Sequence, residues 1–111
     1  MTPGNPLETV RGLGADEAKC QFHKPVLDSL RTRGMDSDDL LEIVKSELGE
    51  AHCYASRRTE KYYPGTVSDY YTLWVDVCGD RMFLKRLVSG PGTADEQLVI
   101  TSFKKDRRHG G

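Results

Sequence analysis

The spacing of hydrophobic residues changes from helical to alternating near Gly49. Before that point, apolar side chains recur at intervals of three, four and seven residues: Leu40, Leu41, Val44 and Leu48. This spacing indicates one apolar face of a helix in the segment MDSDDLLEIVKSELG, which Asp36 or Ser37 can cap. A preceding helix is predicted to begin near Lys24, because Pro25 suits a first turn, and to end before Gly34.

After Gly49 the period becomes two, which is typical of strands with one buried face. Four segments show it: Ala51–Arg58, Tyr70–Cys78, Arg81–Ser89 and Gln97–Phe103. The connection around Gly79 is short enough for a tight hairpin, so we expect an antiparallel meander. The predicted fold class is α+β, a two-layer sandwich with two N-terminal helices on one face of a four-stranded antiparallel sheet. The other face of the sheet is expected to be open.

The prolines and glycines between residues 1 and 15 interrupt any regular period, so this segment is predicted to be a flexible N-terminal arm. Residues 16–105 are predicted to form a single α+β domain. Residues 106–111, which include Arg107 and Arg108, are expected to form a basic C-terminal tail.

Composition narrows the class of protein. The 111 residues are 37% hydrophobic and 30% charged, which suits one folded domain. A formal net charge of −1 excludes a generally basic surface for binding nucleic acid.

No apolar run reaches the roughly 20 residues that span a bilayer, so we expect no membrane interaction. Three cysteines without a disulfide pattern suit a reducing compartment, and we expect a cytoplasmic protein without a structural disulfide.

The segment HCYASRRTEKYYPGTVSDYY is dense in cations and phenol rings. Such a mixture can bind RNA, because cations hold phosphates while aromatic rings stack on exposed bases. The RNA-binding candidates are Tyr54, Arg58, Lys61, Tyr70 and Lys85. Metal-free cleavage of RNA needs an acid or base and a cation at the phosphate, and the catalytic candidates are His52, Arg57 and Lys104. The alternative is that the tyrosines are half-buried sheet residues and that the histidine is structural.

The sequence contains residue types that bind zinc: Cys20, His23, His52, Cys53 and Cys78. The spacing is poor, because adjacent strand residues such as His52 and Cys53 point to opposite faces. We therefore expect no metal site and no cofactor.

Short motifs in the strands resemble a known family. They are Tyr54, the Trp74, Asp76, Val77 set, Phe83-Leu84-Lys85, and Val99 to Lys104. In this order they are similar to the MqsR-like mRNA interferase toxins, and the segment RGMDSDDLL resembles a helix start in BrnT-like toxins. The likeness covers roughly residues 37–105. It implies a RelE-like fold, ribonuclease activity and a partner antitoxin protein.

The resemblance carries over Lys104, the lysine of the last strand motif. Three other catalytic positions of the family are changed: Ala55 replaces a lysine, Val75 a glutamine and Phe83 a tyrosine. The leading hypothesis is a bacterial toxin of a toxin-antitoxin pair that binds RNA and cleaves it without metal. The alternative is a non-catalytic protein-protein interaction module with the same fold, and a small-molecule enzyme has no supporting motif.

Overall fold

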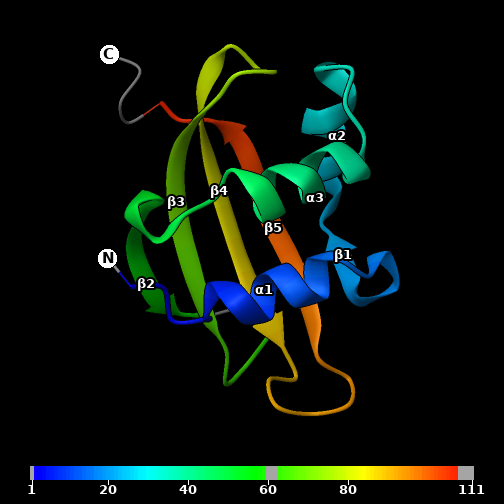
Figure 1. Ribbon diagram of the computed structural model, residues 1–111, viewed down its shortest axis with the longest axis vertical. Coiled ribbons are helices and arrows are strands. Elements are labelled where there is room, and N and C mark those ends of the chain that lie inside the picture. The colour runs from blue at the N-terminus through cyan, green and yellow to red at the C-terminus, as the bar shows by residue number, and fades with distance from the viewer. Residues whose placement is uncertain (1, 60–62, 108–111) are drawn as a thin grey trace.

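A computed structural model describes residues 2–59 and 63–107 (Figure 1). Its three α-helices are α1 (Leu7–Gly14), α2 (Lys24–Thr32) and α3 (Ser37–Ser46). Its five strands are β1 (Cys20–Phe22), β2 (Cys53–Arg58), β3 (Val67–Val75), β4 (Asp80–Ser89) and β5 (Gln97–Lys105). Two 3₁₀ turns, η1 (Glu17–Lys19) and η2 (Glu50–His52), precede β1 and β2. The fold is α+β, as the sequence predicts.

The sheet has the strand order β1-β5-β4-β3-β2. Strands β2 to β5 pair as consecutive antiparallel neighbours, which confirms the predicted meander. The prediction of four strands is wrong, because β1 adds a fifth strand parallel to β5, with Gln21 opposite Val99. A strand of three residues is too short to show alternation, and its pairing with a strand far along the chain leaves no local signal.

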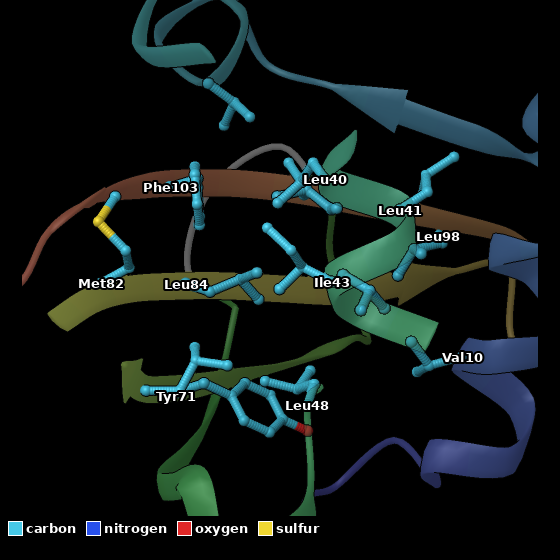
Figure 2. Close-up of a cluster of buried hydrophobic side chains, with 14 of the residues drawn as sticks. Val10, Leu40, Leu41, Ile43, Leu48, Tyr71, Met82, Leu84, Leu98 and Phe103 are labelled. Carbon is cyan, nitrogen blue, oxygen red and sulfur yellow. The ribbon is translucent and has the colours of Figure 1, made fainter. Parts of the chain in front are cut away.

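Helix α3 begins as its sequence predicts. The Asp36 carboxylate accepts a hydrogen bond from the Asp39 N–H at 3.0 Å, and the Asp39 carboxylate accepts one from the Asp36 N–H at 2.9 Å. The predicted apolar face is buried, and Leu40 and Ile43 point toward Leu84 and Phe103 of the sheet (Figure 2). Helix α2 packs mainly against β5. Burial of these side chains is the main favourable term in the free energy of folding.

The N-terminal segment is not an irregular arm. Residues Leu7–Gly14 form helix α1, whose Leu7, Val10 and Leu13 join the core. Helix α1 packs against α3 and β5, so the predicted pair of helices is a set of three (Figure 1). Leu7, Val10 and Leu13 recur every three residues, a helical signal masked by the glycines between and after them. The predicted basic tail begins at Asp106, which is buried, and residues 108–111 lie outside the described residues.

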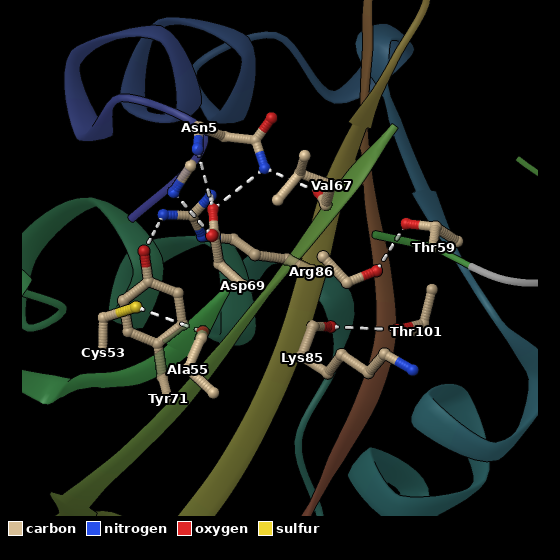
Figure 3. A network of polar contacts seen from close by, with 12 residues as sticks. Asn5, Cys53, Ala55, Thr59, Val67, Asp69, Tyr71, Lys85, Arg86 and Thr101 are labelled. Atoms are coloured by element: carbon tan, nitrogen blue, oxygen red, sulfur yellow. Dashed lines mark hydrogen bonds and ion pairs between the residues drawn. The ribbon is translucent and has the colours of Figure 1, made fainter. Parts of the chain in front are cut away.

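A buried polar network joins the segment before helix α1 to strands β3 and β4 (Figure 3). The Asp69 carboxylate accepts hydrogen bonds from the Gly4 N–H at 2.7 Å and from the Asn5 N–H at 2.9 Å. Its Oδ2 lies 3.6 Å from Nη1 of the fully buried Arg86, which donates through Nη2 to the Tyr71 hydroxyl. Burial lowers the pKa of Arg86, while Tyr71 and Asp69 raise it. Burial also raises the pKa of the Tyr71 hydroxyl, which therefore stays neutral.

Replacing Asp69 by alanine is expected to destabilise the protein by about 3–5 kcal/mol, because the Arg86 guanidinium then lies buried without a counterion. The measurement is the free energy of unfolding in urea. Asp95→Ala, at an exposed loop position, is the matched control and should cost under about 0.5 kcal/mol. A loss below about 1 kcal/mol for Asp69→Ala would contradict a structural role for the ion pair.

Candidate functional site

The sheet face opposite the core carries a line of polar and aromatic residues from neighbouring strands. Tyr70 of β3 pairs with Lys85 of β4, and Lys85 pairs with Ser102 of β5. Arg57 of β2 pairs with Ser68, two residues before Tyr70 on the same face. Because side chains alternate along each strand, these residues point away from the helices. The pair of residues beside Tyr70 and Lys85 on the same two strands is Asp69 and Arg86. Both are fully buried on the core side of the sheet.

Three aromatic rings cluster on this face. Tyr54, Tyr70 and Phe83 have ring centroids 6.1–6.5 Å apart. The Arg57 guanidinium carbon lies 5.4 Å from the Tyr70 ring centroid and the Lys85 Nζ lies 5.1 Å from it. These distances allow cation-π attraction.

A third cation extends the cluster toward the end of β5. The Lys104 Nζ lies 5.8 Å from the Phe83 ring centroid. Positive charge and aromatic surface are thus combined across four strands, although they are separated in the sequence.

Two open hollows flank Tyr70 and Arg57. The first, named the His23 hollow, has a volume of about 510 Å³. It is lined by His23, Arg57, Arg58, Tyr63, Tyr70 and Lys85, with hydroxyls of Thr59, Ser68, Thr101 and Ser102. The second, named the Phe83 hollow, has a volume of about 340 Å³ and is lined by Tyr54, Arg57, Tyr70, Phe83 and the segment 104–107. A nucleotide-sized group fits either hollow.

Six of the eight predicted site residues line the two hollows. Arg57, Arg58, Tyr70 and Lys85 line the His23 hollow, and Tyr54 and Lys104 line the Phe83 hollow. Lys61 lies outside the described residues.

His52 does not lie with the other predicted residues. It belongs to η2, where its Nδ1 accepts a hydrogen bond from the Gly49 N–H at 2.9 Å, and it lines neither hollow. The contact of His52 with Gly49 is local to this turn, and the catalytic role of His52 stays a prediction.

His23 and Tyr63 are functional candidates that the sequence did not reveal. The His23 Nε2 lies 3.1 Å from the Tyr63 hydroxyl oxygen, inside the His23 hollow. His23 follows the short strand β1, and its backbone N–H donates to the Ile100 carbonyl at 3.1 Å. Since nothing local predicts β1, the sequence gives no sign that residue 23 meets residue 63. The sequence suggested only a zinc role for His23.

The three cysteines are free thiols. Burial raises the pKa of Cys20 to about 11, with Asp16 and Glu17 adding to the effect, and burial also raises the pKa of Cys53 and Cys78. No group of three or more histidine, cysteine, aspartate or glutamate side chains within residues 2–59 and 63–107 is arranged to hold a metal ion.

Comparison with known proteins identifies no relative of this chain. No family model matches the chain, and no curated protein matches it. In the part of the chain that the structure describes, no helix has the length and apolar character needed to cross a membrane.

The raised pKa values predict slow reactions of the thiols with disulfide reagents. At pH 8 about one Cys20 side chain in 1,000 is ionised, since its pKa is about 11. In the Cys53→Ser/Cys78→Ser variant, we expect Cys20 to react at least about tenfold more slowly than glutathione, with a rate that rises about tenfold per pH unit from 7 to 9. The reaction is followed by the absorbance of the aromatic thiolate that Ellman's reagent releases. A Cys20 rate equal to that of glutathione would contradict this.

Proposed function

We propose that this protein binds single-stranded RNA on the open face of its sheet. The observation that carries the proposal is the placement of the Arg57 and Lys85 cations against the Tyr70 ring, with Lys104 against Phe83. Cations attract phosphates, and exposed aromatic rings stack on bases that are free of a duplex. The net charge of −1 makes this local cluster the source of the attraction for RNA.

The two hollows suit different parts of a nucleotide. The His23 hollow combines cations with hydroxyls, which suits a phosphate and a ribose. The Phe83 hollow combines aromatic rings with Lys104, which suits a base and the next phosphate. Arg57 and Tyr70 line both, so one strand of RNA can occupy the two hollows together.

The proposal includes metal-independent cleavage of the RNA. In such a reaction the ribose 2′-hydroxyl attacks the adjacent phosphorus, and the five-coordinate transition state carries extra negative charge. In the proposed reaction, Arg57 and Lys85 stabilise that charge and Lys104 binds the neighbouring phosphate; their distances to the Tyr70 and Phe83 rings support this. With the resemblance in its strands, this chemistry favours a cytoplasmic toxin that a partner antitoxin protein neutralises.

A non-catalytic interaction module is the second candidate. Trp74 and Val77, at the end of β3 and in the following turn, are 55% and 70% exposed. Aromatic side chains such as tryptophan are enriched in protein-protein interfaces, so Trp74 is the residue that a partner protein would contact in this candidate function. Ala55, Val75 and Phe83 also depart from the catalytic pattern of the toxins that the strands resemble.

The RNA-binding proposal predicts that Arg57→Ala and Lys85→Ala each weaken binding of a single-stranded oligoribonucleotide about tenfold. Each substitution should also reduce the slope of log affinity against log salt by about 0.7, because one phosphate contact is lost. Fluorescence anisotropy of a labelled oligonucleotide measures both. Lys19→Ala, an exposed cation on η1, is the matched control. Equal losses in all three variants would contradict the proposed surface.

The cleavage proposal predicts that the purified protein cuts RNA in the presence of excess chelator. The products should carry 2′,3′-cyclic phosphate and 5′-hydroxyl ends, which mass spectrometry identifies. Arg57→Ala with Lys104→Ala should lower the rate at least about 100-fold, because charge stabilisation is a large part of catalysis. Wild-type protein that binds RNA but leaves it intact would contradict the proposed cleavage and leave the proposed RNA binding in place.

A further inference from the structure

We propose that His23 and Tyr63 form the proton-transfer pair of the site, an inference that rests on the proposed cleavage of RNA. The pair is joined by the 3.1 Å contact between the His23 Nε2 and the Tyr63 hydroxyl. Their ring centroids are 5.9 Å apart and their planes differ by 27°, so the rings are stacked. Both residues line the His23 hollow, beside the cations assigned to the phosphate.

The fold holds His23 from two sides. Its N–H donates to the Ile100 carbonyl, which extends the β1-β5 pairing by one residue. Its carbonyl accepts from the N–H groups of Val26 and Leu27 at 2.9 and 3.2 Å, in the first turn of α2. The backbone of His23 is thus fixed at the junction of a strand and a helix, and the contact with the Tyr63 hydroxyl orients the imidazole, as an acid-base group requires.

Tyr63 is held from the opposite wall of the hollow. Its carbonyl accepts a hydrogen bond from the buried Thr66 hydroxyl at 2.7 Å. The connection between β2 and β3 is closed by the Thr59 N–H, which donates to the Thr66 carbonyl at 3.0 Å. Residues 23 and 63, which follow the two edge strands β1 and β2, are thus brought together in the His23 hollow.

The groups that face this pair suit an anion. Arg57 and Arg58 come from β2, Tyr70 from β3 and Lys85 from β4, while β5 contributes the hydroxyls of Thr101 and Ser102. No carboxylate among the described residues lines the hollow. A phosphodiester held by these cations lies between them and the His23-Tyr63 pair, where it can receive a proton.

The proposed reaction balances without an added reagent. The 2′-oxygen loses its proton to water and forms a bond to phosphorus, while the bond from phosphorus to the 5′-oxygen breaks. The Tyr63 hydroxyl gives its proton to the departing 5′-oxygen and takes one from the protonated His23 Nε2. Histidine suits this step because each of its ring nitrogens can either donate or accept a proton. The products are a 2′,3′-cyclic phosphate and a 5′-hydroxyl, and His23 regains a proton from solvent.

The competing explanation is a structural clasp, in which the His23-Tyr63 contact only holds the connection between β2 and β3. The two explanations differ in what each variant loses. A clasp affects folding and RNA binding, whereas a proton-transfer pair affects the cleavage rate alone. Tyr63→Phe retains the stacked ring but has no proton to give, so it separates these effects.

The experiment measures single-turnover cleavage in chelator together with RNA affinity and thermal unfolding. His23→Ala should lower the cleavage rate at least about 100-fold and Tyr63→Phe at least about tenfold, with RNA affinity within about threefold of wild type. Free imidazole should restore part of the activity of His23→Ala. Gln21→Ala, on the neighbouring strand β1, is the matched control, and His23→Gln serves if His23→Ala unfolds.

Four results would overturn the inference. The first is a wild-type cleavage rate in both His23 variants. The second is parallel loss of cleavage and RNA affinity without rescue by imidazole, which indicates a clasp. The third is loss of cleavage in His52→Ala with full activity in His23→Ala. The fourth is wild-type protein that binds RNA without cleaving it, which removes the proposed cleavage and this inference but leaves RNA binding intact. Failure to bind RNA would instead remove the proposed function itself.

Discussion

The buried pair of Asp69 and Arg86 sets the register on which the open face depends. The two residues lie opposite each other on β3 and β4, and the next pair is Tyr70 with Lys85. Figure 3 shows the side chains of Arg86 and Lys85 leaving opposite sides of β4. A slip of β4 by one residue would move Arg86 to the opposite face, away from Asp69, and Lys85 into the core. The interaction that fixes the sheet therefore also fixes the centre of the candidate site.

A second constraint acts on β5. Ile100 pairs with Arg86 and Ser102 with Lys85, so Thr101 is an extra residue between them, and its hydroxyl donates to the Lys85 carbonyl at 3.3 Å. This bulge shifts the alternation by one residue. It buries Phe103, opposite Leu84, and turns Lys104 toward the Phe83 ring. Without it, Lys104 would share the core face with Ile100.

The sequence predicts the parts of this molecule that local physics specifies. The alternation of apolar and polar residues predicted the meander, and the capping residue Asp36 predicted the start of α3. Each of these signals lies within a few residues of the chain. Strand β1 and the meeting of His23 with Tyr63 depend on pairing with distant segments, which no local pattern records. His52 was misplaced for a related reason: the residues before Cys53 form a 3₁₀ turn, and the register of β2 shifts between Cys53 and Ala55.

The strand resemblance and the proposed reaction point to different residues as the proton donor. In the toxins that these strand motifs resemble, the tyrosine of a Tyr-Leu-Lys motif has a catalytic role, and the similar motif of this chain has Phe83, which has no proton to give. Phe83 instead completes an aromatic cluster, while a hydroxyl and an imidazole lie in the adjacent hollow across Tyr70. Arg57 and Tyr70 line both hollows, so the two hollows adjoin each other at the centre of the candidate site. In the proposed reaction, the cations therefore come from the strands of the sheet, whereas the acid comes from a loop and the start of a helix.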